Sequence, residues 1–509
     1  MKTPLLARIE RGANFLHEKM KNKVQLITYV DRFGGSNLPQ LQELLTGPLQ
    51  GVFGGVHLLP FFHKIDGADA GFDPIDHTQV DERLGDWQDI KALSDHAEIM
   101  ADVIVNHMSS ESPQFLDFSR QGEASRYNGL FLTMDAVFPK GATEQELLAI
   151  YRPRPGMPFT VTTLSNGQKR LLWTTFTPQQ IDIDVHHPAG QSYLDSILRS
   201  LADSGVSMVR LDAVGYAIKK AGHSCFMMPE TFEFIGQFAA RARELGLEVL
   251  VEIHSYYKRQ IEIAKQVDWV YDFALPPLVL HALEFGRSGP LRNWLAERPK
   301  NAVTVLDTHD GIGIIDIGAD ASDRKGSPGL VPPDELDELV ERMHRNSQGE
   351  SRKATGAAAS NLDLYQVNCT FYDALGRNDA AYLAARAIQF FVPGIPQVYY
   401  VGLLAGHNDM ALLERTQVGR DINRHYYSRN EVLSDLQRPV VRKLIELIRL
   451  RNTHPAFAGK FMAQPSPDDQ LCLQWTAGDA GIELHVHLPS KTARITHWEK
   501  SERSVLELD

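Results

Sequence analysis

Residues 206–212 have the sequence Val-Ser-Met-Val-Arg-Leu-Asp, a short apolar run that ends in a charged residue. Runs of the same kind, rich in β-branched residues and bounded by turn residues, recur along the chain. Because such runs are apolar on both faces, they predict strands that are buried on both faces, as in a parallel sheet. The eight runs are Val24–Val30, Val56–Pro60, Met100–Val105, Val206–Leu211, Leu247–Ile253, Trp269–Phe273, Ala302–Leu306 and Gln397–Val401.

The segments between most of these runs show helical periodicity. Apolar residues recur at three- and four-residue spacing between Tyr193 and Leu201 and again between Phe232 and Ala242. Strands that alternate with helices predict βα units. Eight such units predict an α/β fold with a closed (β/α)8 barrel.

The eight runs extend from Val24 to Val401, which exceeds the about 250 residues of a plain barrel. Most of the surplus lies after the third and seventh runs, where insertions are predicted to act as lids and specificity elements above the active site. Beyond an amphipathic helix at Val440–Arg451, alternating apolar residues predict a small β domain. The predicted division is an N-terminal extension (1–20), the first part of the barrel (21–107), an inserted subdomain (108–185), the second part of the barrel (186–310), a second inserted subdomain (311–375), the end of the barrel (376–455) and the C-terminal β domain (456–509).

The composition excludes several classes of protein. With 43% hydrophobic and 23% charged residues in 509, the chain is globular and not disordered. Its formal net charge of −12 argues against a nucleic-acid or anionic-membrane partner, because both need a basic face. Three cysteines do not make a disulfide framework, and no apolar run reaches the ~20 residues that cross a bilayer, so we expect a cytoplasmic protein. Apolar residues at Leu5, Ile9, Phe15 and Leu16 predict a peripheral amphipathic helix.

Three predicted strands end in carboxylates. Asp212 closes the fourth strand, Glu252 the fifth and Asp310 the seventh. In a barrel these strand ends meet at one face, where charged residues are typical of catalysis, whereas a charge inside a strand is costly to bury. Each acid taken singly is equally consistent with a structural ion pair. Three acids that converge with Arg210 predict an active site.

Paired carboxylates suit glycosyl transfer with retention, in which one is the nucleophile and the other protonates the leaving oxygen. Arg210 points to the same side of its strand as Asp212, so we expect it to lower the pKa of Asp212 and keep this nucleophile ionised. Glu252 has no basic residue in its own strand end, so we expect desolvation to raise its pKa, as a general acid requires. Asp310 is expected to hold sugar hydroxyls and to favour a cationic transition state.

Two other chemistries compete with this interpretation. Asp, Glu and His at strand ends also bind divalent metals, but the chain has no His-x-His pair on the first strand and no His-Glu-x-x-His motif. A non-catalytic carbohydrate sensor usually lacks one of the carboxylates, and all three are present here. Aromatic residues near the strand ends suit stacking on sugars, although some are expected to serve only packing: Phe72, Phe176, Tyr216, Tyr256, Tyr257 and Tyr365.

Segments at these strand ends resemble the motifs of the α-amylase superfamily of retaining α-glycosidases, in the same order. The segments are Asp102–His107, Val209–Asp212, Val251–His254, Asp307–Asp310 and Pro393–Tyr400. Within that superfamily the chain resembles the sucrose phosphorylase family from about Lys21 to about Asn452. The stretches that show this are Val24–Asp31, Asp66–His77, Phe131–Phe159, Arg210–Tyr216, Asn361–Asn368 and Gly419–His425. Chains of the family begin near Met20, so residues 1–19 resemble an extension or a wrongly assigned start.

The resemblance implies a role for each matched residue. Asp212 would be the nucleophile, Glu252 the acid/base and Asp310 the transition-state stabiliser. The implied glucosyl site consists of Asp69, Phe72, His107, Phe176, Gln180, Arg210, His309 and Arg420, with Tyr216 nearby. The implied acceptor site consists of Pro153, Arg154, His254, Leu362, Asp363, Tyr365 and Gln366.

The implied substrates are sucrose and inorganic phosphate, with no cofactor. The amylase branch often binds calcium around the residue that matches Asn106, but sucrose phosphorylases do not need the ion, so no metal is expected. Sister phosphorylases form dimers, so the resemblance is compatible with a homodimer, but no interface signature in the sequence demands one. The resemblance also implies that the two insertions exchange fructose-binding and phosphate-binding arrangements, with Gly156 and residues 356–360 allowing the movement.

Alternatives remain within the same fold. They are phosphorylases of glucosylglycerol, sucrose 6′-phosphate or glucosylglycerate, and a sucrose hydrolase. A phosphorylated fructose needs additional basic residues in the acceptor loop, and residues 358–366 contain none, which favours sucrose. A hydrolase would lack a phosphate-attracting arginine, the role that the resemblance gives to Arg154.

Overall fold

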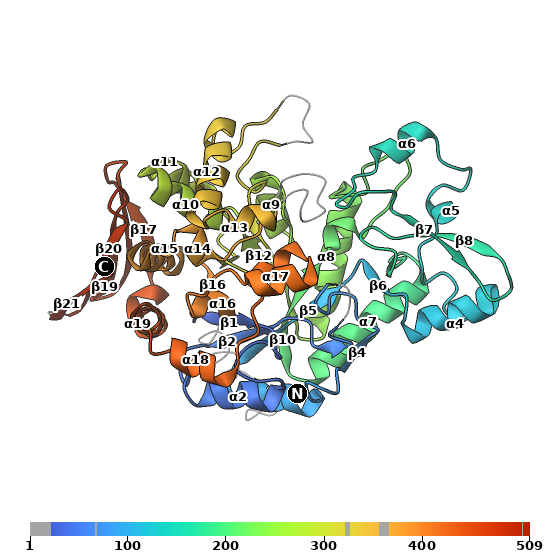
Figure 1. The fold of residues 1–509 in the computed structure, drawn as a ribbon, viewed down its shortest axis with the longest axis horizontal. Helices are drawn as coiled ribbons and strands as arrows, with labels where there is room; N and C mark the ends of the chain where they lie inside the picture. Colours follow the sequence, from blue (N-terminus) through green and yellow to red (C-terminus); the bar gives the residue numbers. More distant parts are fainter. Residues whose placement is uncertain (1–21, 67–68, 321–325, 356–365, 501, 509) are drawn as a thin grey trace, which may run out of the picture.

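A computed structural model describes residues 22–66, 69–320, 326–355, 366–500 and 502–508. Its centre is a closed barrel of eight parallel strands in the order β1-β16-β13-β12-β11-β10-β5-β2 (Figure 1). The barrel strands are β1 (Gln25–Thr28), β2 (Gly55–Leu58), β5 (Glu98–Ile104), β10 (Val206–Asp212), β11 (Glu248–Val251), β12 (Trp269–Asp272), β13 (Ala302–Thr304) and β16 (Ile395–Tyr399). Each lies within or overlaps one of the eight predicted runs, so the barrel prediction is confirmed.

Helices surround the barrel and bury apolar side chains. In α7 (Pro188–Asp203) the residues Tyr193, Ile197 and Leu201 are buried at helical spacing, and the helix begins with a proline at its first position. α8 (Pro229–Glu244) buries Ile235, Phe238 and Ala242 in the same way. Further helices are α2 (Leu38–Thr46), α3 (Trp87–Ser94), α9 (Tyr257–Ala264), α10 (Leu275–Phe285), α11 (Gly289–Glu297), α15 (Asp379–Phe391) and α19 (Pro439–Thr453).

The chain between β5 and α7 forms a lobe at the right of Figure 1. It contains α4 (Pro113–Gln121), α5 (Met134–Val137), α6 (Glu144–Ala149) and the hairpin of β7 (Phe159–Thr163) and β8 (Lys169–Trp173). A small hydrophobic core around Trp173 and Phe138 holds the lobe together. Two short strands, β6 (His107–Ser109) and β9 (Gln180–Asp182), pair antiparallel and tie the lobe to the barrel mouth.

The chain after β13 makes the second excursion. β14 (Ile312–Gly313) pairs with β15 (Gln366–Val367), and between them lie α12 (Pro333–Asn346) and α13 (Glu350–Lys353). The sequence analysis assigned no helix here, yet α12 buries Leu339, Val340 and Met343 on one face. α14 (Phe371–Ala374) follows, and α16 (Tyr400–Leu403), α17 (Met410–Thr416) and α18 (Arg429–Asp435) come after β16.

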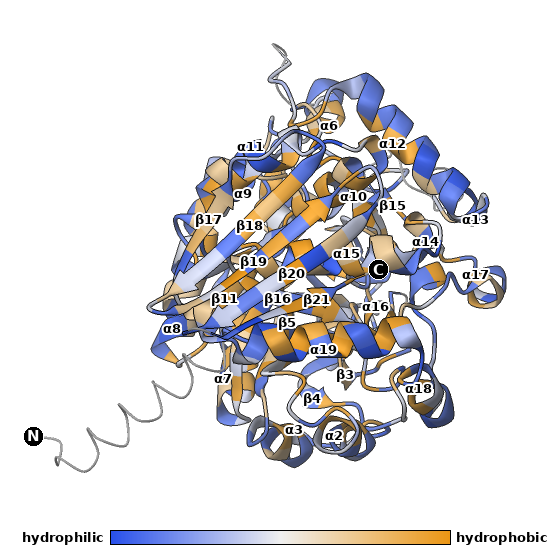
Figure 2. Cartoon of the chain, turned by 90° about the vertical axis from the view of Figure 1, so that its left-hand side faces the viewer, coloured by the Kyte–Doolittle hydropathy of each residue, from blue (hydrophilic) through white to orange (hydrophobic). Residues whose placement is uncertain are grey.

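A five-stranded antiparallel sheet ends the chain, as predicted. Its strands are β17 (Lys460–Gln464), β18 (Gln470–Ala477), β19 (Ala480–His487), β20 (Thr492–Glu499) and β21 (Glu502–Glu507). Hydrophilic and hydrophobic residues alternate along β18 and β19 (Figure 2), and Leu471, Leu473, Leu484 and Val486 are buried. The Trp475 indole donates a hydrogen bond of 2.7 Å to the carbonyl of Phe391, which joins the sheet to α15.

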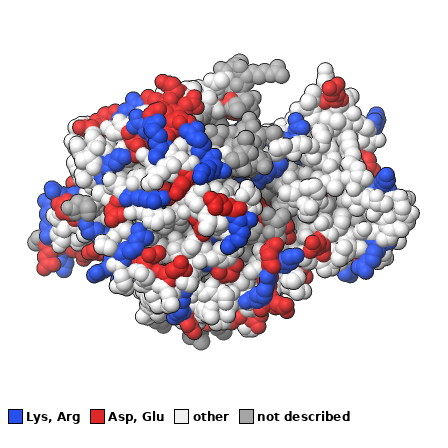
Figure 3. All heavy atoms as spheres, viewed as in Figure 1, with Lys and Arg blue, Asp and Glu red and all other residues white. Residues whose placement is uncertain are grey.

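Other predictions concern the N-terminus, the domain boundaries and the surface. The amphipathic helix predicted within residues 1–20 lies outside the described residues, and the boundaries given for the domains stay predictions. In the described part of the chain, no helix combines the length and apolar character that crossing a bilayer requires. On the face shown in Figure 3, basic and acidic side chains of the described residues are interspersed.

Candidate active site

A pocket of about 670 Å³ opens at the carboxyl ends of the barrel strands. Fifteen predicted site residues line it: Asp69, Phe72, His107, Pro153, Arg154, Phe176, Gln180, Asp212, Tyr216, Glu252, His254, His309, Asp310, Gln366 and Arg420. Arg210 lies among the carboxylates without lining the pocket. Leu362, Asp363 and Tyr365 fall outside the described residues. The structure therefore brings together every predicted catalytic and substrate-binding residue that it describes. Of the other aromatic candidates, Tyr256 lines the pocket, whereas Tyr257 packs edge-on against Trp294.

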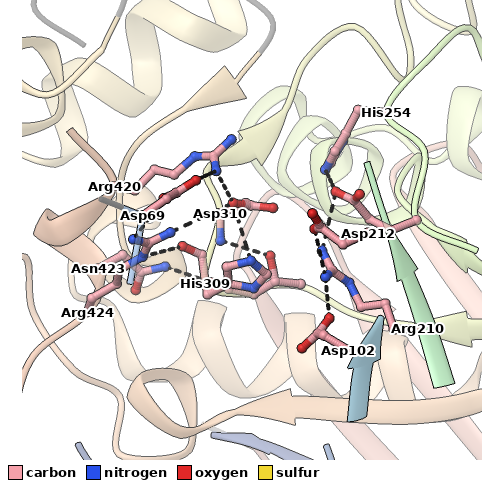
Figure 4. Close-up of polar contacts among 12 residues, drawn as sticks. Asp69, Asp102, Arg210, Asp212, His254, His309, Asp310, Arg420, Asn423 and Arg424 are labelled. Carbon is pink, nitrogen blue, oxygen red and sulfur yellow. Dashed lines mark hydrogen bonds and ion pairs between the residues drawn. The ribbon is translucent and has the colours of Figure 1, made fainter. Parts of the chain in front are cut away.

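Arg210 joins three carboxylates on one wall of the site (Figure 4). The β-sheet register sets this geometry, because Arg210 pairs with Asp102 on β5, and Leu211 pairs with Val251, so that Asp212 and Glu252 follow at the same level. The guanidinium forms an ion pair with Asp102 and lies 3.0 Å from Asp212 Oδ1 and 3.5 Å from Glu252 Oε1.

A buried histidine contacts Asp102 in this wall. His57 Nε2 lies 3.0 Å from Asp102 Oδ2, and both side chains are at most 1% exposed. Although burial opposes ionisation, Arg210 and His57 lower the pKa of Asp102 to about 2. Asp102 therefore stays charged and holds Arg210 in place.

The prediction about the pKa of Asp212 is wrong. Burial raises the pKa of Asp212 well above its usual value, and the charges of Glu252 and Asp102 add to the rise, whereas Arg210 opposes it only in part. For Glu252, the sequence analysis considered only basic residues in its own strand end, but Arg210 on the neighbouring strand lies 3.5 Å from its carboxylate. Both carboxyls therefore lie beside the same guanidinium. Arg210 lies closer to Asp212, at 3.0 Å, than to Glu252, at 3.5 Å.

The opposite wall is a second cluster of alternating charges (Figure 4). Arg420 Nη1 lies 2.8 Å from Asp310 Oδ1 and 3.9 Å from Asp69 Oδ2. Arg424 Nη1 lies 3.6 Å from Asp69 Oδ1, and its Nε donates a hydrogen bond of 2.9 Å to the His309 carbonyl. Burial would raise the pKa of Asp310, but Arg420 and His309 hold it well below its usual value. Asp310 is thus a fixed negative charge.

Aromatic rings form the floor between these walls. The Phe72 ring stacks on His309 with centroids 4.7 Å apart and planes 9° apart. His107 Nε2 lies 3.0 Å from the Phe72 carbonyl, and the His107 ring lies edge-on to Phe176 with centroids 5.3 Å apart. Phe176 in turn contacts Tyr216. Flat apolar rings beside charged groups suit a ligand with one apolar face and a rim of hydroxyls, such as a pyranose.

Comparisons with known proteins agree with this geometry. Residues 50–272 match the family model described as "Alpha amylase, catalytic domain". A sucrose phosphorylase from Agrobacterium vitis is 60% identical over 94% of this chain and 97% of its own. The chain belongs to the sucrose phosphorylase family of the α-amylase superfamily.

Other relatives are phosphorylases with the same or a different named substrate, and their identities to this chain differ. A sucrose phosphorylase from Bifidobacterium adolescentis is 58% identical over 90% of each chain, whereas a glucosylglycerol phosphorylase from Marinobacter adhaerens is 41% identical over 94% of this chain and 97% of its own. The crystal structure of a sucrose 6F-phosphate phosphorylase from Thermoanaerobacter thermosaccharolyticum superposes with a TM-score of 0.88 at 37% identity, covering 96% of this chain and 98% of that chain.

Around Asn106, where the resemblance places the calcium site of the amylase branch, this chain has a lysine ammonium group. Lys219 Nζ donates a hydrogen bond of 2.7 Å to Asn106 Oδ1 and lies 2.6 Å from Asp182 Oδ2. It also donates to the Tyr216 carbonyl. Because an ammonium group already binds the oxygens that calcium would need, these residues do not suit the ion.

A second set of potential metal ligands lies in the pocket itself. Atoms of Glu252, His254 and Asp310 lie within 4.8 Å of one another. Arg210 lies 3.5 Å from Glu252 and Arg420 lies 2.8 Å from Asp310, so guanidinium groups already neutralise these carboxylates. The set is therefore better suited to binding sugar hydroxyls than to binding a metal.

Several residues of the site were missed by the sequence analysis. Tyr151 and Phe226 stack at the rim with centroids 4.8 Å apart, and Arg424 supports Asp69. Tyr151 and Arg424 belong to stretches that the sequence analysis singled out, so the signal was present. Asp316, which contacts His254, follows no motif and had no signal in the sequence.

Proposed function

We propose that the chain catalyses the reversible phosphorolysis of sucrose to α-D-glucose 1-phosphate and D-fructose. The observation that supports this most directly is the convergence of Asp212, Glu252 and Asp310 on one pocket, in a chain 60% identical to a sucrose phosphorylase over almost its whole length. Glucosylglycerol and sucrose 6F-phosphate phosphorylases match at 41% and 38%, which makes their substrates the alternatives.

The proposed mechanism is a double displacement with retained configuration. An oxygen of Asp212 attacks the anomeric carbon of the glucosyl group, the bond from that carbon to the fructosyl oxygen breaks, and Glu252 gives its proton to that oxygen. A phosphate oxygen then attacks the same carbon and displaces Asp212, while Glu252 takes up the proton that the phosphate loses. Asp310 favours the cationic transition state by its fixed negative charge.

The remaining residues divide between the two ends of the pocket. In this proposal Asp69, Arg420, His107 and His309 bind glucosyl hydroxyls, Phe72 stacks on the ring, and Phe176, Gln180 and Tyr216 complete the glucosyl side. Arg210 acts by holding the carboxylates. Pro153, Arg154, His254 and Gln366 form the acceptor side, to which the proposal adds Leu362, Asp363 and Tyr365. A guanidinium such as Arg154 suits phosphate oxygens.

The proposal includes no cofactor and no metal ion, which the contacts of Lys219 with Asn106 and Asp182 support. It places the enzyme in the cytoplasm, in keeping with free thiols at Cys225, Cys369 and Cys472. A homodimer is the proposed assembly, on the basis of the resemblance alone, and light scattering of the purified protein tests it.

Product analysis tests the reaction. Purified protein is incubated with sucrose, with and without inorganic phosphate, and Asp212→Asn serves as the control for contaminating activity. Phosphate-dependent release of fructose with equal α-glucose 1-phosphate is the expected result. Free glucose in equal amounts in both tubes would show a hydrolase, and activity only on glucosylglycerol or sucrose 6′-phosphate would show the wrong acceptor.

A further inference from the structure

His254 lines the proposed acceptor side of the pocket, with one ring nitrogen in contact with a carboxylate and the other without a hydrogen-bond partner among the described residues. Its Nδ1 lies 2.8 Å from Asp316 Oδ2, and its ring stacks on Phe273 with centroids 3.8 Å apart. Its Nε2 is buried, has no hydrogen-bond partner among the described residues and lies 3.8 Å from Glu252 Oε1. The ring thus presents one nitrogen to whatever occupies the space beside the acid/base.

Asp316 reaches His254 from a distant part of the chain, in the excursion after β13. It is fully buried and accepts hydrogen bonds of 3.1 Å from the Ser255 backbone and 2.9 Å from Gln260 Nε2, in addition to its contact with His254. These three contacts hold the Asp316 carboxylate in one orientation. Because an ionised carboxylate only accepts hydrogen bonds, the proton between Asp316 and His254 belongs to Nδ1.

The backbone is shaped to let this carboxylate approach. A Cβ on Gly313 would lie 2.1 Å from Asp316 Oδ2 and 3.0 Å from His254 Nδ1. Real Cβ atoms do not approach so closely, so only glycine leaves room for the pair at this position. This close approach is an observation independent of the hydrogen bonds.

We propose that Asp316 is a positioning residue for phosphate capture, which keeps Nδ1 of His254 protonated so that Nε2 presents a charged N–H to the acceptor side. The proposal rests on the proposed function. An imidazolium beside Glu252 and Asp310 adds positive charge where a phosphate dianion must enter an acid-rich pocket. Burial would lower the pKa of His254, but the charges of Asp316 and Glu252 raise it above its usual value, which supports the cationic form.

Two substitutions separate the charge of Asp316 from its hydrogen bonds. In Asp316→Asn the oxygen can still accept from Ser255 and Gln260, while the amide NH2 faces Nδ1 and moves the His254 proton to Nε2. The ring then keeps its donor toward the pocket but loses its positive charge. Gly313→Ala keeps the carboxylate and displaces it from the ring.

The test is steady-state kinetics with inorganic phosphate as the varied substrate. Asp316→Asn is expected to raise KM for phosphate about tenfold, as for the loss of one charge-assisted hydrogen bond, and to raise it by a larger factor than that by which kcat falls. Gly313→Ala is expected to raise the same KM. The matched control is Asp373→Asn, because Asp373 is also fully buried and lies 3.1 Å from a histidine nitrogen, that of His407, but does not line the pocket.

A double-mutant cycle tests whether Asp316 acts through His254. In a His254→Gln background, Asp316→Asn is expected to cause no further rise in KM for phosphate. An unchanged KM in Asp316→Asn, an equal rise in Asp373→Asn, or additive effects in the double variant would each overturn the positioning role. All these outcomes require a wild-type enzyme that is phosphorolytic. A wild type without phosphate-dependent activity would refute the proposed function, and this result is distinguishable from a failure of the positioning role.

Discussion

Replacing Lys219 with methionine is expected to destabilise the protein. The Lys219 side chain is 2% exposed and that of Asp182 is fully buried, and their ion pair spans 2.6 Å. Methionine fills a similar volume but has no charge, so the variant leaves Asp182 as a buried carboxylate without its cation and leaves Asn106 Oδ1 without its donor.

The size of the effect follows from these contacts. Breaking a buried ion pair by removing one partner costs ~3–5 kcal/mol. Asp182 keeps hydrogen bonds from the Thr175 backbone, at 3.0 Å, and from the Thr175 hydroxyl, which places the loss near ~3 kcal/mol, the lower end of that range. For 509 residues an unfolding entropy of ~2 cal/mol/K per residue gives ~1 kcal/mol/K, so Tm should fall by ~3 °C.

Scanning calorimetry measures this shift, with two variants as controls. Lys220→Met removes the neighbouring, half-exposed lysine, whose ion pair with Glu230 lies at the surface, and is expected to leave Tm unchanged. Asp182→Asn combined with Lys219→Met removes the orphaned charge and should recover part of the loss. The reasoning is refuted if Lys219→Met is as stable as Lys220→Met, or if the double variant is less stable than Lys219→Met alone.

Three further predictions concern the chemistry. Asp212→Asn and Glu252→Gln should each lower kcat by a factor of ~10³ or more, with Tm within about 2 °C of wild type, and near-wild-type turnover in either variant would contradict the assigned roles. Because the pKa of Asp212 is raised and the nucleophile must be ionised, kcat/KM should fall with decreasing pH along a limb centred above 3.8, and a profile that stays flat to below that pH would contradict the raised pKa. Prolonged treatment with EDTA should change neither Tm nor the rate, since Lys219 already binds Asn106; a loss that calcium restores would show that this position holds a metal.

The sequence by itself determined the barrel and the places of the three carboxylates near its strand ends. A strand buried on both faces needs apolar residues along its whole length, so a local apolar run in the sequence shows where the strand lies. Eight such runs in order are compatible with few folds. The same locality placed Asp212, Glu252 and Asp310 at strand ends that meet. It also put Arg210 on the same side as Asp212, because alternate residues of a strand share a face.

Only the tertiary structure decided the surroundings of these groups. Asp316 meets His254 across 62 residues, and Lys219 meets Asn106 across 113. Sequence periodicity does not predict such pairs. Which side chains meet across the fold depends on the paths of loops, and the local sequence does not define these paths. The pKa of Asp212 was mispredicted for the same reason: the sequence shows its nearest cation, but desolvation depends on how much of the molecule closes around the carboxyl, and burial outweighs Arg210.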